Sequence, residues 1–472
     1  MHIHIIAICG TGMASLAGML KEAGFTVTGS DHNAYPPMST IIENLGIKLI
    51  HEFAPANLDP PPDLIIVGNA VSKNNPEVKA MLERGLPYCS FPAALAKFFL
   101  HDKYPVVVSG THGKTTTSSL LSWILESSGY EPGFLIGGIP VNFSRNYKIG
   151  KKKHFIIEGD EYDTAFFDKN PKFLHYKPKL AILTNIEFDH ADIYHSIDEI
   201  KQAFRKFIAL IPPDGHLIAC IDNAHVRELC REAQCTVHTC GFHHESTWKL
   251  DEVHIESHSS SCKIISPDHL PEPVLVRSKL IGTYNMVNAL CAFVGAFIIG
   301  VHPEIIAQSI LSFRGVKRRQ EVFTEINGIT LIDDFAHHPT SVRETLAGLK
   351  ARYKDRRLWA LFEPRTATSK RNVFQEEYRS AFTHADKIII AGVYQEDMIE
   401  PSMRLSPEQL AREINKNGQD ALYIKEVNAI VDYCAQNLRK DDVVVIMSPG
   451  GFDNIYKKLP LALAHSTHTK RN

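Results

Sequence analysis

The sequence has few cysteines, no long apolar run and almost no net charge, and each shortage excludes a class of protein. Its nine cysteines are odd in number and never spaced as Cys-x-x-Cys, which argues against a disulfide framework or a zinc–cysteine cluster and favours a cytoplasmic location. The apolar run 289–301 is shorter than the roughly 20 residues that cross a bilayer, so we expect no membrane insertion. The 51 basic residues nearly balance the 53 acidic ones, and we therefore expect no nucleic-acid partner; no obligate protein partner is evident either.

The length indicates several domains. At about 150 residues per domain, 472 residues correspond to about three domains. The 44% hydrophobic and 22% charged residues are typical of globular cores. Residues 1–20 are apolar, but they contain glycines and no early Lys or Arg, so they indicate a strand, a loop and a helix instead of a signal peptide.

Short β-branched runs alternate with stretches of helical periodicity, which predicts an α/β fold with parallel sheets. Turn-rich residues 101–105 and basic residues 314–319 place the boundaries, giving domains 1–100, 101–315 and 316–472. We expect residues 235–268 to form a peripheral antiparallel excursion without a site. The predicted strands are Ile3–Ile8, Leu64–Val67, Val106–Val108, Phe155–Ile157, Ala181–Leu183, Thr330–Ile332, Leu358–Phe362, Lys387–Ile390 and Val443–Met447.

Residues 106–117 read Val-Val-Val-Ser-Gly-Thr-His-Gly-Lys-Thr-Thr-Thr, a strand that runs through a glycine loop into a helix. Glycines let backbone N–H groups approach phosphate oxygens, the lysine offsets their charge and a hydroxyl can bind Mg²⁺. A tight turn with an incidental lysine is the alternative. The predicted phosphate-binding residues are Gly110, Thr111, His112, Gly113, Lys114, Thr115 and Thr116.

Acidic side chains follow the next two predicted strands of this domain. Glu158, Asp160 and Glu161 come after the first of them, and residues 185–190, Asn-Ile-Glu-Phe-Asp-His, come after the second. Ligands of open α/β sheets lie at the carboxyl edge of the strands, where carboxylates can hold a phosphate-bound Mg²⁺. We therefore predict that Glu158 is a metal ligand. For His190 there are two alternatives, a functional residue or a surface residue.

The N-terminal segment carries a partial dinucleotide-binding fingerprint, with Ser15 where the third glycine is expected. It could bind NAD or another nucleotide diphosphate, or serve only helix packing. The candidate ligand-binding residues are Gly10, Thr11, Gly12, Met13, Asp31 and Asn69.

Together these motifs, with Gly282-Thr-Tyr-Asn-Met-Val-Asn288, Gly315–Arg319 and Asp333–Pro339, resemble the Mur ligases of peptidoglycan synthesis over essentially the whole chain. The resemblance implies three domains: a Rossmann-like N-terminal domain for a UDP-sugar, a central P-loop ATPase domain and a Rossmann-like C-terminal domain for the amine. It also implies the cofactors ATP and Mg²⁺ and amide formation through an acyl phosphate.

The resemblance assigns roles residue by residue. Lys114, Glu158 and His190 would be catalytic, with Thr115, Glu158 and His190 as metal ligands. Asn285 and Asn288 would face adenine, Asp334 the ribose, and Arg318 or Arg319 the phosphates. The N-terminal candidates would bind the UDP-sugar. His337, His338, Arg365 and Lys370 would contact the peptide or the acyl phosphate.

Two branches of the family use UDP-N-acetylmuramate as the acceptor: one adds L-alanine, the other the murein tripeptide L-Ala-γ-D-Glu-meso-diaminopimelate. The tripeptide branch is favoured by the motifs 35–40, 68–70, 160–168, 187–190, 362–365 and 447–452, although Pro449 stands where that branch has Asn. Outside the family, an NAD oxidoreductase would leave the Lys114 loop unexplained. A nucleotide-switched binding protein would use that loop without forming a bond.

Overall fold

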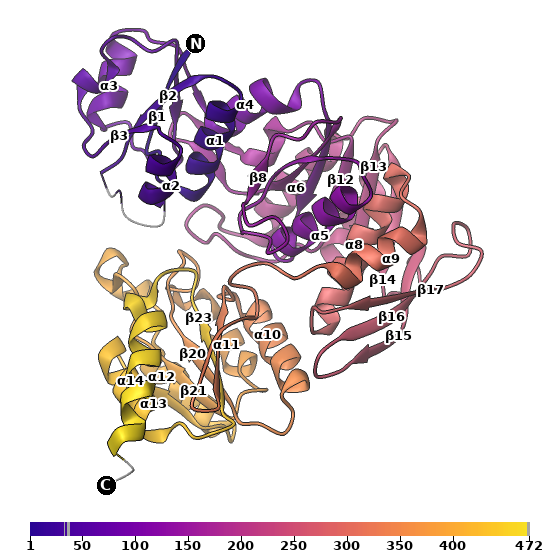
Figure 1. Cartoon of the computed structure of the whole chain (residues 1–472), viewed down its shortest axis with the longest axis vertical. Coiled ribbons are helices and arrows are strands. Elements are labelled where there is room, and N and C mark those ends of the chain that lie inside the picture. Colours follow the sequence, from indigo (N-terminus) through magenta and orange to yellow (C-terminus); the bar gives the residue numbers. More distant parts are fainter. Residues whose placement is uncertain (33, 35–37, 470–472) are drawn as a thin grey trace.

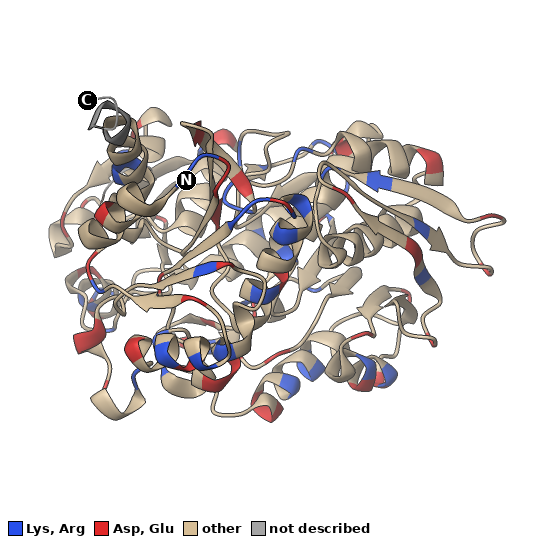
Figure 2. Ribbon diagram, turned by 90° about the horizontal axis from the view of Figure 1, so that it is seen from below, with Lys and Arg blue, Asp and Glu red and all other residues tan. Residues whose placement is uncertain are grey.

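The computed structural model describes residues 1–32, 34 and 38–469, with side chains through residue 465. Its strands form three large sheets and one small hairpin, and Figure 1 shows the three α/β units in chain order. Among the described helices, none combines the length and apolar character needed to span a bilayer. Lys and Arg are interspersed with Asp and Glu over the ribbon in Figure 2, in keeping with the formal charge of −2.

The N-terminal sheet has five parallel strands in the order β3-β2-β1-β4-β5. Its first strand ends at Ile6, earlier than the predicted Ile8, because Ala7 turns the chain with a positive φ of 63°. The elements are β1 His2–Ile6, α1 Thr11–Glu22, β2 Thr26–Ser30, α2 Met38–Asn44, β3 Lys48–Ile50, β4 Leu64–Val67, α3 Pro76–Glu83, β5 Tyr88–Ser90 and α4 Phe91–Leu95.

The central sheet has ten strands in the order β17-β16-β15-β14-β13-β12-β6-β9-β7-β8. Its parallel core places the carboxyl ends of β6, β9 and β12 side by side. Its helices are α5 Lys114–Ser127, α6 Ile197–Ala209, α7 Ala224–Leu229, α8 Thr283–Ile299 and α9 Pro303–Ser312. Its strands are β6 Tyr104–Ser109, β7 Gly133–Leu135, β8 Tyr147–Lys148, β9 His154–Gly159, β12 Leu180–Leu183, β13 His216–Cys220, β14 Thr236–Gly241, β15 Trp248–Ile255, β16 Ser260–Ile265 and β17 Val274–Ser278, with β10 Asp163–Ala165 and β11 Asp168–Pro171 as a separate hairpin.

The predicted antiparallel excursion at 235–268 is only partly correct. β15, β16 and β17 do pair antiparallel, but β14 continues the parallel sheet beside β13. The polar residues of β14 hide the alternation that would indicate a strand. Pairing with its neighbours and packing against α8, not the pattern of its own sequence, bury this strand.

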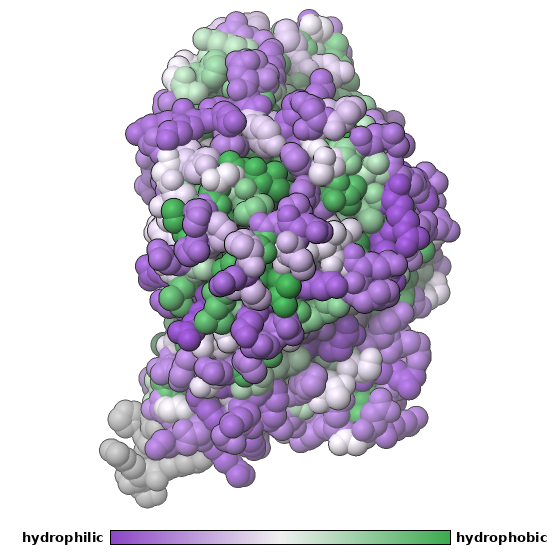
Figure 3. Space-filling view, turned by 90° about the vertical axis from the view of Figure 1, so that its right-hand side faces the viewer, coloured by the Kyte–Doolittle hydropathy of each residue, from purple (hydrophilic) through white to green (hydrophobic). Residues whose placement is uncertain are grey.

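Hydrophilic residues predominate on the face of the molecule seen in Figure 3, with apolar residues gathered in its middle.

The C-terminal sheet has the order β18-β19-β23-β20-β21-β22, parallel except for the edge strand β18. An apolar core covers each of its two faces. The elements are β18 Glu321–Ile326, β19 Ile329–Asp334, α10 Pro339–Arg352, β20 Leu358–Phe362, α11 Gln375–Ala381, β21 Lys387–Ile390, α12 Pro407–Lys416, β22 Ala421–Tyr423, α13 Val427–Asn437, β23 Val443–Met447 and α14 Ile455–Thr469.

The linking segments position the sites. The loop from β6 to α5 lies at the carboxyl edge of the central sheet and faces the start of α10 in the C-terminal unit. The predicted boundaries at residues 100 and 315 remain a proposal; β6 begins at Tyr104 and β18 at Glu321.

Candidate active site

The glycine loop between β6 and α5 has a backbone that only glycine adopts easily. Gly110 and Gly113 have φ values of 132° and 83°, and a Cβ on Gly113 would lie 2.5 Å from Asn288 Oδ1. Asn185, at the end of β12, fixes the loop from the other side, since its Oδ1 accepts a hydrogen bond from His112 N at 2.8 Å. The loop is therefore preformed between β12 and α8, with the start of α5 directly behind it.

Lys114 lies at the start of α5 with 13% of its side chain exposed, and it is paired with a carboxylate. Its Nζ donates to Gly110 O at 2.5 Å and lies 3.0 Å from Glu161 Oε2. Burial by itself would lower the pKa of Lys114, but Glu161 and the neighbouring acids outweigh it and raise that pKa above its ordinary value. The side chain is thus an ammonium at neutral pH, held beside the loop where phosphates would bind.

Glu158 ends β9 and faces the hydroxyl of Thr115. Its Oε2 accepts a hydrogen bond from Thr115 Oγ1 at 3.0 Å, and its Oε1 accepts one from Gly137 N at 2.6 Å. Burial, with Asp160 nearby, raises the pKa of Glu158. A hydroxyl and a carboxylate oxygen are ligands that suit a hard cation such as Mg²⁺, whose charge would also offset the cost of burying the carboxylate.

His190 contacts Glu161. Its Nε2 lies 3.3 Å from Glu161 Oε1, and the residue has a positive φ of 54°. Burial would lower the pKa of His190, but Glu161 and Asp189 raise it. No role is predicted for Glu161 from the sequence, yet this residue contacts both His190 and Lys114. Its position in an acidic run directly after a buried strand could have indicated a functional residue.

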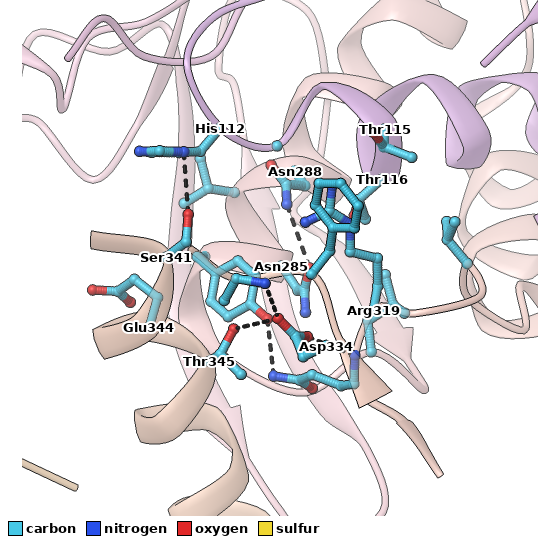
Figure 4. A pocket seen from close by; sticks show the side chains of 18 of the residues that line it. His112, Thr115, Thr116, Asn285, Asn288, Arg319, Asp334, Ser341, Glu344 and Thr345 are labelled. Atoms are coloured by element: carbon cyan, nitrogen blue, oxygen red, sulfur yellow. Dashed lines mark hydrogen bonds between the residues drawn. The ribbon is translucent and has the colours of Figure 1, made fainter. Parts of the chain in front are cut away.

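A cavity of about 690 Å³ opens between the glycine loop, α8 and the β19–α10 region. Figure 4 shows Thr115 and Thr116 on one side of it and Asp334 and Thr345 on the other, with Asn285 and Asn288 between them. Of the predicted residues, Thr111, His112, Gly113, Lys114, Thr115, Thr116, Asn285, Asn288, Arg319, Asp334 and His337 line this cavity.

Tertiary structure separates the two neighbouring arginines. Arg319 lines the cavity and lies over the Phe335 ring, with its guanidinium carbon 4.9 Å from the ring centroid. Arg318 turns away: its Nε lies 2.9 Å from Asp333 Oδ2, and its Nη2 donates to the carbonyl oxygens of Ser448 and Gly450. Of the predicted pair, only Arg319 is therefore placed to face a ligand in this cavity.

The cavity also has lining residues that carried no predicted role. Tyr284 Oη accepts a hydrogen bond from Gln320 Nε2 at 2.9 Å, which joins the start of α8 to the C-terminal unit. Asp222, beyond the carboxyl end of β13, accepts hydrogen bonds from the backbone of Phe242 and His243. An acid just after a buried strand was the signal that could have found Asp222.

Three side chains meet where the central and C-terminal units touch. Glu187 Oε2 lies 3.4 Å from His112 Nε2 and 3.6 Å from His338 Nδ1, and it accepts a hydrogen bond from Thr340 Oγ1 at 2.6 Å. Burial and the neighbouring His112 lower the pKa of His338 to about 3, so its ring is neutral. His338 also caps α10, whereas His337 belongs to the lining of the large cavity.

Two loops of the C-terminal unit pack together around Arg365. Its Nη1 lies 3.2 Å from Glu363 Oε1, and its guanidinium carbon lies 3.6 Å from the Tyr394 ring centroid. Ser448 donates to the other oxygen of Glu363 at 2.5 Å. A Cβ on Gly450 would lie 2.1 Å from Arg365 Nε, so glycine is required for this approach. The arginine is thus held by both loops.

Lys370 lies farther along the loop that carries Arg365. It is half-buried, and burial, together with Arg371 and Arg365, lowers its pKa. Arg371 and Arg365 are close enough to influence the Lys370 charge, so this loop carries three neighbouring cations.

The N-terminal candidates gather at the β1–α1 turn. Gly10 is the N-cap of α1, and Asp31 Oδ2 accepts a hydrogen bond from Cys9 N at 2.9 Å. Asn69 is exposed in the turn after β4. Ser15, where a dinucleotide fingerprint would have glycine, accepts a hydrogen bond from Asn146 Nδ2 at 2.8 Å and so contacts the central unit. Of the motif at 35–40, residues 35–37 lie outside the described chain.

Models of three protein domains match the chain in order. The Mur ligase family catalytic domain matches residues 2–103, the Mur ligase middle domain residues 108–296, and the Mur ligase glutamate ligase domain residues 318–450.

Individual relatives match over nearly the full length. A protein of Escherichia coli K12 named UDP-N-acetylmuramate–L-alanyl-γ-D-glutamyl-meso-2,6-diaminoheptanedioate ligase is 38% identical, covering 98% of each chain. A UDP-N-acetylmuramate–L-alanine ligase of Carboxydothermus hydrogenoformans is 34% identical, covering 97% of this chain and 96% of the relative. The crystal structure of a murein peptide ligase from Psychrobacter arcticus is 34% identical, with a TM-score of 0.76 over 98% of this chain and 99% of that one. With its three sheets, its glycine loop and these full-length matches, the chain belongs to the Mur ligase family.

Proposed function

We propose that this ligase uses ATP and Mg²⁺ to join the carboxylate of UDP-N-acetylmuramate to the amine of the murein tripeptide L-Ala-γ-D-Glu-meso-diaminopimelate, with release of ADP and phosphate. The E. coli relative, which is named for this peptide, and the P. arcticus relative, which is named a murein peptide ligase, support the choice of substrates. The cavity at the glycine loop supports a nucleotide site, because Lys114, Asn285, Asn288 and Asp334 all line it.

The first step activates the acceptor. A carboxylate has a poor leaving group, so an oxygen of the lactyl carboxylate attacks the γ-phosphorus of ATP, the bond to the β-phosphate oxygen breaks, and an acyl phosphate and ADP form. Phosphoryl transfer depends on positioning and on charge stabilisation. The Lys114 ammonium and the N–H groups of the glycine loop would supply that stabilisation, and Arg319 would add a second cation from the C-terminal domain.

The second step forms the amide. The neutral amine of the peptide attacks the acyl carbon, the tetrahedral intermediate collapses with loss of inorganic phosphate, and the nitrogen loses a proton. His190 contacts Glu161, which is paired with Lys114, and both would lie near the transferring group and orient the carboxylate. His337, in the wall of the cavity, and Arg365 would hold the incoming peptide.

Thr115 and Glu158 would hold Mg²⁺, with His190 as a ligand on the acceptor side. When bound, the ion would supply positive charge to the phosphate oxygens. The donor set fits this use because Thr115 Oγ1 and Glu158 Oε2 already face each other at 3.0 Å.

Arg365 and the residues that hold it in place would determine which amine substrate is selected. The stretches 362–365 and 447–452 distinguish the tripeptide motif set from the alanine set, and they pack on one another through Glu363, Ser448 and Gly450. A fixed guanidinium suits a peptide with several carboxylates, because Arg binds carboxylates bidentately. Pro449 lies between Ser448 and Gly450 in this loop.

The N-terminal turn would bind the UDP-sugar through Gly10, Thr11, Gly12, Met13, Asp31 and Asn69. We also retain the domain boundaries at 100 and 315 and a cytoplasmic location as parts of this proposal. The proposed reaction includes no obligate protein partner.

One competition assay tests the function. UDP-N-acetylmuramate, ATP and Mg²⁺ are offered with equimolar L-alanine and tripeptide, and product masses are recorded. We expect the tripeptide product and stoichiometric ADP. A predominant L-alanyl product would assign the chain to the alanine-adding branch, and ATP hydrolysis without either product would contradict ligation.

A further inference from the structure

We propose that His112, Glu187 and His338 form a binding site for a transition-metal ion such as Zn²⁺, separate from the Mg²⁺ site and bridging the central and C-terminal domains. Each of the three residues offers one ligand atom, and these atoms lie within 4.8 Å of one another. Nothing in the ligase reaction requires an ion here.

The spacing of the ligand atoms fits a tetrahedral ion. Two ligands bonded at about 2.0–2.1 Å around a tetrahedral ion lie roughly 3.3–3.4 Å apart. Glu187 Oε2 is 3.4 Å from His112 Nε2 and 3.6 Å from His338 Nδ1. The ligand nitrogens of the two imidazoles lie within 4.8 Å of each other, so an ion bound by all three side chains would draw the two rings together.

The outer nitrogen of each ring has a partner that fixes the ring with its inner nitrogen toward Glu187. His338 Nε2–H donates to Phe188 O at 3.1 Å, so the lone pair lies on Nδ1, where a metal ion would replace the hydrogen bond that Nδ1 accepts from Thr340 N at 3.2 Å. His112 Nδ1 lies 3.1 Å from Ser341 Oγ, an interaction visible in Figure 4. Metal-bound histidines are commonly oriented in this way by a carbonyl or hydroxyl oxygen.

An orphaned atom points to a missing ligand. Within the described chain, His112 Nε2 is buried without a hydrogen-bond partner, although Glu187 Oε2 is near. A buried polar atom left unpaired costs free energy, and coordination of a metal ion would remove this cost. A smaller cavity of about 210 Å³, lined by Glu187 and His338, gives room for water as the fourth ligand.

The donor set selects the kind of ion. Two imidazoles and one carboxylate suit Zn²⁺ or Co²⁺, whereas Mg²⁺ prefers oxygen ligands and octahedral geometry. The site spans two domains because His112 belongs to the glycine loop and His338 to the start of α10. Its occupancy would fix the loop against the peptide-binding domain.

Cobalt provides a direct spectroscopic test. The full-length protein is titrated with Co²⁺ in excess Mg²⁺, which occupies the oxygen-rich site. We expect one tightly bound Co²⁺ per chain with the intense visible absorption of tetrahedral Co²⁺, displaced by Zn²⁺. His338→Gln and Glu187→Gln should each weaken binding by more than about 100-fold, since changes to outer partners alone cost 10–100-fold.

His337→Gln is the matched control, because it removes a neighbouring imidazole outside the cluster and should leave the spectrum and affinity unchanged. Zn²⁺ should raise the melting temperature of the wild type and of His337→Gln but not of His338→Gln, whose folding is checked by circular dichroism. Failure to bind Co²⁺, a weak octahedral spectrum, thiolate charge-transfer bands or unaltered binding in His338→Gln would overturn the site.

Discussion

Lys114 and Glu161 form a largely buried ion pair, with Nζ 3.0 Å from Oε2, across the mouth of the glycine loop. The same carboxylate contacts His190 through its other oxygen. A phosphate that reaches Lys114 thus enters a site whose cation is already held in place by a carboxylate. The loop's lysine and the acidic run after β9 act as one unit, although 47 positions separate them in the chain.

Lys114→Met should lower kcat by about 100-fold or more, because the ammonium stabilises charge on the transferring phosphoryl group. UDP-N-acetylmuramate affinity, measured by calorimetry, should change little. Breaking a buried pair leaves an uncompensated carboxylate, so stability should also fall. The double variant Lys114→Met/Glu161→Gln removes that charge and should recover stability without recovering turnover. Near wild-type kcat in either variant would exclude Lys114 from the phosphoryl-transfer step.

Glu158→Gln should raise the Mg²⁺ concentration for half-maximal rate by about 10–100-fold, since it replaces a charged metal ligand with a neutral one of the same shape. Rates are measured over a Mg²⁺ series at saturating ATP. Glu126→Gln, which alters an ion pair with Lys148 outside the large cavity, is the control and should keep the wild-type requirement. An unchanged requirement in Glu158→Gln would mean that Mg²⁺ binds elsewhere.

Arg365→Ala should raise the KM for the tripeptide about tenfold or more, because a charge-assisted hydrogen bond contributes roughly 1.5–3 kcal/mol. Glu363→Gln should give a smaller increase, since it loosens the guanidinium without removing it. Steady-state kinetics with ATP and UDP-sugar saturating provide the measurement. Arg379→Ala removes a surface arginine paired with Glu376 and is the matched control. If Arg365→Ala and Arg379→Ala have the same KM, Arg365 does not contact the peptide.

Glu77 should make the N-terminal domain sensitive to acid. Burial would raise the pKa of Glu77, but hydrogen bonds from His4, Ser30 and Asn57 outweigh it and lower that pKa below 4.5. The ionised carboxylate therefore stabilises the fold above the unfolded pKa, and this stabilisation is lost as pH falls through the lower folded value.

Glu77→Gln should remove part of this acid dependence. Calorimetric melting temperatures between pH 3 and pH 6 should fall less steeply in Glu77→Gln than in the wild type. The exposed Glu43→Gln is the control and should follow the wild-type curve. A parallel curve for Glu77→Gln would show that the network does not depend on the charge.

The sequence by itself determined the local chemistry of this protein. The glycine loop from Gly110 to Thr117 and the acids after β9 follow strands whose apolar residues are contiguous, so backbone preferences and burial specify them without help from distant segments. Parallel α/β order follows from the same short-range pattern. The family resemblance, in turn, identified residues such as Asn285, whose role no local pattern indicates.

Only the tertiary structure decided which side chains meet. Arg318 and Arg319 are adjacent and alike, and their opposite directions depend on Asp333 in β19 and on the loop after β23, which lies 130 positions away in the chain. Likewise, the contact of Glu187 with His338 depends on how two domains approach each other. Local propensity acts over a few residues, whereas these choices are set by packing between segments more than a hundred residues apart, which no local pattern records.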